Sequence, residues 1–139
     1  MRLLLDTHVL LWWFTDDIRL SVAARQALAD PANLLFASAA SAWEVATKQR
    51  LGKLTGVPEA AARWVELLQA DGIAPLPVNQ QHALRAGSYA QPHRDPIDRM
   101  LAAQSEIEDL TLVTADPELP AFGCKILWAG SGLASCLPP

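Results

Sequence analysis

Short apolar runs alternate with helical segments along this chain, and that alternation limits the possible folds more than any other feature. Each run is short enough for a buried strand, and the segments between the runs have helical periodicity. We expect strands at residues 2–5, 33–37, 73–78, 110–114 and 125–128. Because parallel strands need a crossover between them, strands that alternate with helices predict a mostly parallel sheet with helices on both faces.

Capping residues and prolines mark the expected helices. Ser21 is suited to cap a helix that ends at Ala29, and Gly52 is suited to end the helix that precedes it. We expect helices at residues 7–14, 22–29, 39–50, 58–69, 79–90, 96–107 and 117–122. Pro75 and Pro77 cannot donate hydrogen bonds to a strand ladder, so the strand that contains them belongs at an edge of the sheet.

Length and composition fit a single globular domain. The chain has 139 residues, of which 51% are hydrophobic, and this is enough apolar material for one core. We expect the domain to span residues 1–130 and a C-terminal tail, rich in glycine, serine and proline, to occupy residues 131–139. The N-terminal apolar segment is too short for a signal sequence, and no uncharged stretch reaches the roughly 18 residues of a membrane span. We therefore expect a soluble, cytoplasmic protein without a membrane partner.

Four carboxylates recur near the ends of expected strands. Asp6 and Asp116 follow the two most hydrophobic strand candidates. Glu44 lies in the helix after the 33–37 strand, and Asp98 opens another helix. Because open parallel sheets bind ligands at the carboxyl ends of their strands, we expect the four side chains to meet in one anionic pocket. Ionised acids at close range repel one another, and Mg²⁺ or Mn²⁺, which prefer oxygen ligands, would relieve that repulsion.

Each acid also has a structural explanation as a helix cap. Asp6 is suited to cap the first helix, and Ser41 with Glu44 fits the capping-box pattern. Asp95 precedes Pro96, so we interpret Asp95 as the N-cap of its helix rather than as a site residue. Natural caps are often Ser, Thr or Asn, whereas here charged residues recur at the same place in the topology. That recurrence favours a shared site over independent capping.

The net charge of −4 argues at first against a nucleic-acid partner. Metal ions held by the four acids would neutralise their charge locally and leave the remaining surface nearly balanced. Lys48, Arg50 and Lys53 also form a short basic cluster. This cluster is equally explained as a helix end that the helix dipole favours. Charge alone therefore leaves a nucleic-acid partner open.

Each of the four acids lies within a longer motif. The motifs are LLDTH at residues 4–8, SAASAWEVA at 38–46, HRDPIDRMLAAQ at 93–104 and LVTAD at 112–116. In this order they resemble the acidic motifs of PIN-domain ribonucleases, and more closely those of VapC-type toxins of bacterial toxin–antitoxin pairs. The resemblance extends from residue 2 to about residue 128. It implies a Rossmann-like, three-layer α/β/α fold, an endoribonuclease that depends on Mg²⁺ or Mn²⁺, a homodimer, and a cognate VapB-type antitoxin.

The resemblance also assigns roles to the acids. Asp6, Glu44 and Asp98 correspond to the core metal ligands of the family. Asp116 corresponds to a fourth acid, which often acts through a water molecule. The antitoxin is implied to insert a segment near this acidic pocket.

Two threonines complete the implied site. Thr7 and Thr114 are implied to contact a water or a substrate oxygen. The implied reaction is attack of a metal-activated water on the phosphorus of an RNA phosphodiester, which requires no nucleophilic serine or cysteine. The histidines lack the spacing of a zinc site, so we expect packing or surface roles for His8, His82 and His93.

Two other functions fit parts of the sequence. An aspartate after the first strand can act as the covalent nucleophile of a haloacid-dehalogenase-like phosphohydrolase, here Asp6. Such enzymes usually carry a second acid two residues later, where this chain has His8. A non-enzymatic binding module would use the acids only as caps, with Trp12, Trp13 and Phe14 as its partner-binding surface. We expect those aromatic residues in core and dimer packing instead.

Overall fold

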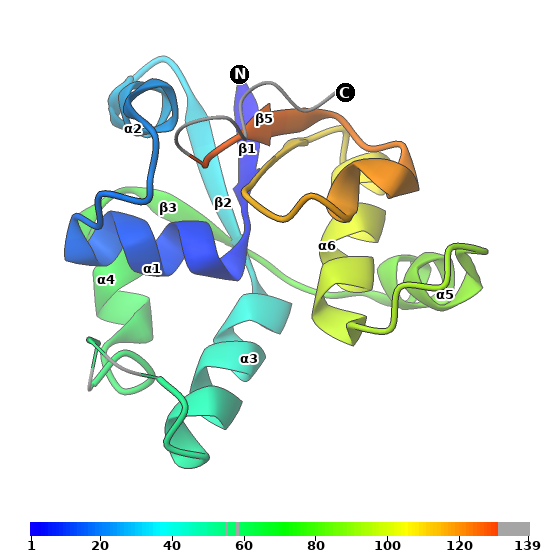
Figure 1. The fold of residues 1–139 in the computed structure, drawn as a ribbon, viewed down its shortest axis with the longest axis horizontal. Helices are drawn as coiled ribbons and strands as arrows, with labels where there is room; N and C mark the ends of the chain where they lie inside the picture. Colours follow the sequence, from blue (N-terminus) through cyan, green and yellow to red (C-terminus); the bar gives the residue numbers. More distant parts are fainter. Residues whose placement is uncertain (55, 58, 131–139) are drawn as a thin grey trace.

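A five-stranded sheet in which all strand pairs are parallel forms the centre of the protein (Figure 1). The computed structural model describes residues 1–54, 56–57 and 59–130. The strands are β1 (Arg2–Leu5), β2 (Leu34–Ser38), β3 (Ile73–Leu76), β4 (Thr111–Thr114) and β5 (Ile126–Trp128). Their order across the sheet is β3-β2-β1-β4-β5. β1 is therefore central, and the proline-containing β3 lies at an edge, as the sequence predicts.

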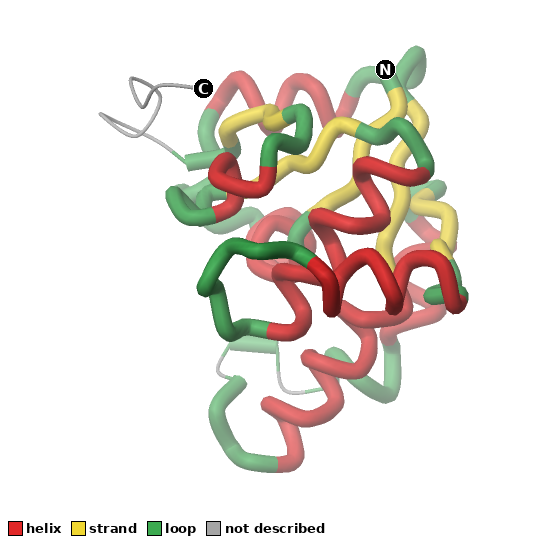
Figure 2. Tube along the Cα trace, turned by 90° about the vertical axis from the view of Figure 1, so that its right-hand side faces the viewer, coloured by secondary structure: helices red, strands yellow, loops and turns green. Residues whose placement is uncertain are grey.

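Helices cover both faces of this sheet. They are α1 (Thr7–Thr15), α2 (Val22–Ala29), α3 (Ala39–Arg50), α4 (Trp64–Ala70), α5 (Gln80–Ser88), α6 (Pro96–Ile107) and the 3₁₀ helix η1 (Leu119–Phe122). Figure 1 shows α1, α2 and α4 to the left of the sheet and α5 and α6 to its right. Figure 2, viewed from that right-hand side, shows helices in front of the strands. The predicted three-layer α/β/α fold is confirmed.

Alternate residues of the central strands point into two separate cores. Leu3 and Leu5 of β1 belong to the core beneath α1, α2 and α4, whereas Leu4 belongs to the core beneath α5 and α6. Val113 and Leu112 of β4 divide between the two cores in the same way. Because strands buried on both faces need apolar residues at every position, β1 and β4 are continuous apolar runs in the sequence.

The start of α3 corrects one expectation from the sequence. Ser38, not Ser41, caps this helix, and its Oγ accepts a hydrogen bond from the backbone N–H of Ala40 at 3.0 Å. Ser41 lies inside the first turn and is fully buried. The predicted capping box of Ser41 and Glu44 is therefore wrong, because the helix begins one turn earlier. Glu44 lies in the second turn, where its side chain cannot cap the helix.

The helix α4 begins later than the sequence predicts. Its first helical residue is Trp64, and the backbone before it, at residues 59–63, forms turns. The backbone N–H of Ala61 donates to Oε1 of Gln49 at 2.9 Å instead of to a helical carbonyl. This long-range hydrogen bond competes with helix formation and is invisible to sequence periodicity. Pro58, expected in the first turn, lies outside the described residues.

The last described residues are tied to the body of the domain. The backbone N–H of Ser21 donates to the carbonyl of Ala129 at 2.8 Å, and Gly130 forms an isolated antiparallel bridge with Leu20. The tail predicted at residues 131–139 lies outside the described residues, so its boundary stays a prediction. Within the described ranges, no helix is long and apolar enough to cross a membrane.

Shortening one side chain of the central strand β1 should test how much its burial contributes to stability. Leu4 is fully buried, so Leu4→Ala should lower the free energy of unfolding by about 2–5 kcal/mol, through lost burial and a residual cavity. Leu84 on α5 is 75% exposed, and Leu84→Ala should change that energy by less than about 0.5 kcal/mol. Urea unfolding followed by circular dichroism measures both. Equal effects of the two substitutions would contradict this description of the core.

Candidate active site

The first acid lies where the two central strands end. β1 and β4 are parallel neighbours, and the ladder continues beyond β1 because the backbone N–H of Asp6 donates to the carbonyl of Val113 at 3.0 Å. Asp6 is also the N-cap of α1, and its Oδ1 accepts the backbone N–H of His8 at 2.9 Å. Its other oxygen, Oδ2, accepts the hydroxyl of Thr114 at 2.6 Å. The Asp6 carboxylate is therefore held from the end of β4 and from the first turn of α1.

The environment of Asp6 opposes its negative charge. Asp6 is only 4% exposed, and this burial is the main reason why the pKa of its carboxyl group is raised. The hydrogen bonds from Thr114 and His8 act in the opposite direction, and the negative charge of Glu44 adds to the increase. Capping alone does not require a carboxylate to be buried beside other acids.

A second group of ligating atoms lies beside Asp6, at the start of α6. Asp95 caps this helix by accepting the backbone N–H of Ile97 at 2.9 Å, as predicted. The side chain of Asp98, in the first turn, is therefore not needed as a cap. Asp98 Oδ2 lies 2.8 Å from Nε2 of His93. One ligating atom from each of His93, Asp98 and Asp116 lies within 4.8 Å of the others. Three separate segments of the chain therefore meet at this edge of the sheet.

The charges of this group act on one another. Burial is the largest cause that raises the pKa of Asp98, which reaches about 7. The negative charges of Asp95, Asp6 and Asp116 raise it further, while the hydrogen bond from His93 opposes the shift. The effect of the Asp6 charge on Asp98 is consistent with the two carboxylates lying near each other. The site is thus a group of partly buried acids with an excess of negative charge.

Glu44 and Thr7 join the same region from its other side. Glu44 projects from the second turn of α3, is 14% exposed at its side chain, and pairs with Nζ of Lys48 at 3.3 Å. Its charge also acts on Asp6. The hydroxyl of Thr7 donates to Oγ of Ser41 at 2.9 Å and so connects α1 to α3. Thr7 thus makes a buried contact between two helices.

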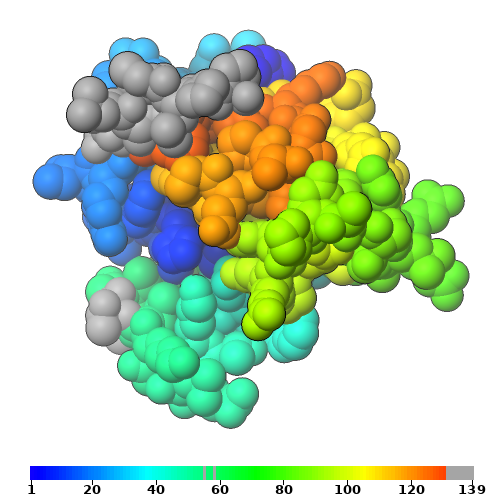
Figure 3. All heavy atoms as spheres, turned by 45° about the vertical axis from the view of Figure 1, so that its right-hand side comes forward, coloured from blue at the N-terminus to red at the C-terminus, as the bar shows by residue number. Residues whose placement is uncertain are grey.

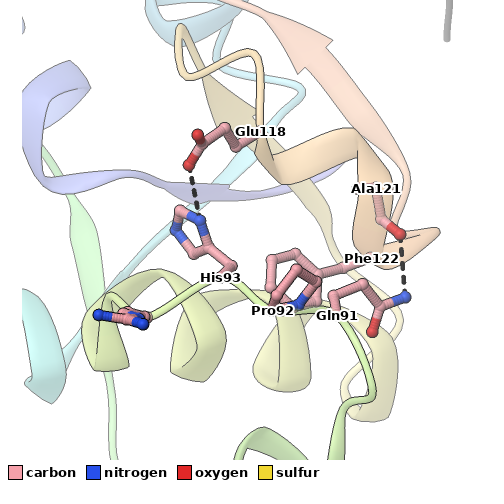
Figure 4. Close-up of a pocket in the computed structure, with 7 residues that line it drawn as sticks. Gln91, Pro92, His93, Glu118, Ala121 and Phe122 are labelled. Atoms are coloured by element: carbon pink, nitrogen blue, oxygen red, sulfur yellow. Dashed lines mark hydrogen bonds and ion pairs between the residues drawn. The ribbon is translucent and has the colours of Figure 1, made fainter.

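Sequence reasoning missed the role of His93. Its ring is 14% exposed at the side chain and lies between two carboxylates, because Nδ1 is 2.7 Å from Glu118 Oε2 (Figure 4). Burial is the largest single effect on its pKa and lowers it, but Asp98, Glu118 and Asp116 together raise the pKa above its ordinary value. His93 packs against Phe122, as a packing role predicts, but its position within the acidic group was not expected from the sequence. No sequence pattern indicates that its loop returns over the start of α6.

Arg99 was also missed, and it shapes the loop that carries His93. Its guanidinium donates to four backbone carbonyl groups at 2.7–3.0 Å. The acceptors are the carbonyl oxygens of Ala86, Tyr89, Gln91 and His93. Arg99 follows Asp98 directly in the sequence, and that position is the only sequence signal for its role. Arg99 therefore ties the end of α5 and the loop between α5 and α6 to the first turn of α6.

Comparison with known proteins gives this arrangement a family. Residues 3–123 match the family model of the PIN domain. The chain belongs to the PIN domain family. No curated protein matches it significantly.

Solved structures share the fold of this PIN domain. VapBC-1 from nontypeable Haemophilus influenzae has a TM-score of 0.65 at 20% identity and covers 91% of this chain and 97% of its own. VapBC2 from Rickettsia felis, bound to a DNA fragment from its promoter, has a TM-score of 0.67 at 14% identity, covering 93% and 99%. FitAcB from Neisseria gonorrhoeae has a TM-score of 0.57 at 21% identity, covering 90% and 96%. At these identities the likeness is one of fold.

The donor set of this PIN domain fits a divalent metal ion. Carboxylate oxygens dominate it, and these are the ligands that Mg²⁺ and Mn²⁺ prefer. Burial is the main cause of the raised pKa values of Asp6 and Asp98, and neighbouring negative charges raise both further. A divalent cation would offset this negative charge and favour the ionised acids. The residues present are therefore suited to hold such an ion.

The pKa shift of Asp98 predicts how stability depends on pH. Its folded value of about 7 lies above the ordinary value of 3.8, so its stabilising effect is fully present below about pH 4 and is lost as pH rises through 7. His93 shifts stability in the same direction, since its pKa is raised too. In EDTA, urea unfolding should therefore give a lower free energy at pH 8 than at pH 5.5. Asp98→Asn should flatten this decline, and an unchanged decline would contradict the assignment.

The four hydrogen bonds from Arg99 to backbone carbonyl groups give a second prediction. Lysine cannot reach four carbonyl groups with one ammonium, so Arg99→Lys should lower the free energy of unfolding by about 1–3 kcal/mol. Arg94 is exposed on the same loop, and Arg94→Lys is the matched control, with an expected change below about 0.5 kcal/mol. Chemical denaturation measures both variants. A loss that is the same for both would show that the hydrogen bonds to the carbonyls contribute nothing specific.

Proposed function

We propose that this PIN domain is a divalent-metal-dependent endoribonuclease and the toxin of a VapC-type toxin–antitoxin pair. The observation that carries the proposal is the convergence of Asp6, Asp98 and Asp116 from three segments at the carboxyl edge of the sheet. Glu44 adds a fourth acid from α3. This arrangement suits hydrolysis of a phosphodiester, whose developing negative charge needs a cation.

In the proposed mechanism, Asp6, Glu44, Asp98 and Asp116 would hold Mg²⁺ or Mn²⁺. When bound, such an ion supplies an activated water and stabilises charge on the phosphate oxygens. The protein's own contribution is orientation. Thr114 and the N–H of His8 fix both oxygens of Asp6, so that this carboxylate needs little rearrangement before it binds a cation.

A cleft next to the acids supports a nucleic-acid substrate. It has a volume of about 520 Å³, lies between α1 and the segment after α3, and is lined partly by Trp12, Arg19, Lys48 and Lys53. The guanidinium of Arg19 lies 5.2 Å from the ring centroid of Trp12. Figure 3 shows the atoms of α1, in dark blue, recessed between the teal segment and the orange segment after β4. Cationic groups beside an aromatic ring suit a single-stranded RNA backbone and its bases.

We also propose an antitoxin partner and a homodimer. The relatives of similar fold include VapBC assemblies and FitAB bound to a DNA fragment, which supports a VapB-type antitoxin here. Large apolar side chains are exposed on several helices, among them Trp43 on α3, which is 65% exposed, and Val65 on α4, which is 66% exposed. Apolar residues of this size at the surface support contact with a further chain.

The structure favours neither alternative function. As a covalent nucleophile, Asp6 would need an accessible carboxylate oxygen, but it is 4% exposed and both of its oxygens accept hydrogen bonds. As a partner-binding surface, Trp12, Trp13 and Phe14 would need to be free, but they are half-buried and pack against the core beneath α1. The nuclease proposal requires neither a covalent bond to Asp6 nor a fully exposed aromatic surface on α1.

Removal of single carboxylates tests the nuclease proposal. Asp6→Asn and Asp98→Asn keep the size of each side chain but remove its charge, and each should lower Mn²⁺-dependent cleavage of RNA at least about 100-fold. Asp30→Asn, at the exposed end of α2, is the matched control and should retain the activity. The assay uses purified protein, freed of any antitoxin, and a mixed-sequence RNA. Undiminished cleavage by both site variants, with folding verified by circular dichroism, would sink the proposal.

A further inference from the structure

One side chain in the acidic pocket is not an acid. His93 belongs to the loop between α5 and α6, and its Nε2 lies 2.8 Å from Oδ2 of Asp98. One ring nitrogen of His93, one Asp98 oxygen and one Asp116 oxygen form the group of ligating atoms described above. In Figure 4 the ring of His93 is directed toward Glu118 at the mouth of a cavity of about 420 Å³. The imidazole is therefore part of the site's donor set.

Contacts independent of any ion hold this imidazole in place. The ring of Phe122 meets it edge to face, with centroids 5.7 Å apart and an interplanar angle of 83°. The backbone carbonyl of His93 accepts a hydrogen bond from Arg99 at 3.0 Å. Glu118 fixes the second ring nitrogen, since Nδ1 lies 2.7 Å from its carboxylate. A histidine with only a surface role needs none of these contacts.

The pairing with Glu118 determines which nitrogen faces the acids. Without an ion, Nε2–H donates to Asp98. When a bound cation displaces this proton and Nδ1–H donates to Glu118, the lone pair of the neutral ring is on Nε2, beside Asp98. Metal-binding histidines commonly have this arrangement, in which a carboxylate accepts the other N–H and orients the ring. Neighbouring ligands on an octahedral ion with bonds of about 2.1 Å are about 3 Å apart, close to the separation of Nε2 and Oδ2.

We propose that His93 Nε2 is a ligand of the divalent ion, beside Asp98 and Asp116, and that Glu118 orients the imidazole. This inference rests on the proposed function, because it concerns the same ion. It also predicts which divalent ion the site binds more tightly. Imidazole suits transition metals, whereas Mg²⁺ strongly prefers oxygen. The site should therefore favour Mn²⁺ over Mg²⁺ more than a site of carboxylates alone.

Pulsed electron paramagnetic resonance of bound Mn²⁺ tests the ligand directly. The wild-type protein should show a ¹⁴N coupling from a coordinated imidazole, which changes to the ¹⁵N pattern when histidine is labelled with ¹⁵N. His93→Gln should lose this coupling. His8→Gln is the matched control: His8 also lies near an acid, with Nδ1 3.9 Å from Asp6 Oδ1, but its side chain is 63% exposed. This control should keep the coupling.

Calorimetric titration gives a second readout that does not depend on RNA cleavage. His93→Gln should weaken Mn²⁺ binding at least about tenfold and Mg²⁺ binding less. Glu118→Gln should weaken Mn²⁺ binding by about 10-fold to 100-fold, the usual effect of removing a group that orients a ligand. Circular dichroism of each variant verifies that it is folded.

The possible outcomes separate this inference from the nuclease proposal. Mn²⁺ that binds and supports RNA cleavage without a nitrogen coupling would overturn the role of His93 and leave the nuclease intact. A nitrogen coupling that His93→Gln removes, in a protein that cleaves no RNA, would support His93 as a ligand and overturn the nuclease. Failure of the wild-type protein to bind any divalent ion would overturn both.

Discussion

The parallel pairing of β1 with β4 places every other part of the pocket. Their ladder extends to the backbone of Asp6, and the hydroxyl of Thr114 then closes on the carboxylate of Asp6 at 2.6 Å. Helices that connect parallel strands run back across the sheet, so α1, α3 and α6 all begin at the carboxyl edge. Their positive dipole ends favour negative groups there. The pairing thus brings Asp6, Asp98 and Asp116 together. The helix dipoles reduce the electrostatic repulsion that this costs.

The cationic side chains nearby do not fully balance the negative charge of these acids. Arg99 is adjacent to Asp98 in sequence, yet its guanidinium donates to backbone carbonyls. Lys48 pairs with Glu44, at the outer side of the pocket. Asp6 and Asp98 are left with raised pKa values, and their side-chain partners are Thr114 and His93 respectively. Burial and neighbouring negative charges make the ionised acids costly for folding, and a bound cation would offset this cost.

Local patterns in the sequence predicted most of the fold and most of the acids. Ser21 as a cap, Pro96 at the first turn of α6 and the prolines of β3 act through nearest neighbours, and the structure bears them out. The same local logic failed at Ser41, because another serine one turn earlier already caps the helix. The position of His93 could not be predicted from the sequence for a different reason. The loop that carries it is shaped by long-range hydrogen bonds, and these leave no periodic trace in the sequence.

The hydrogen bonds from Arg99 to backbone carbonyl groups affect which amino-acid substitutions the neighbouring loop can accept. Arg99 binds the end of α5 and the following loop through backbone carbonyl groups, which every amino acid possesses. Three side chains of the loop add contacts of their own, because Tyr89, Gln91 and His93 reach Glu106, Ala121 and Asp98. The exposed positions on either side of His93, Pro92 and Arg94, make no such contact with the described part of the chain. Substitutions at these two positions can therefore vary the rim of the neighbouring cavity while the path of the loop is inherited unchanged.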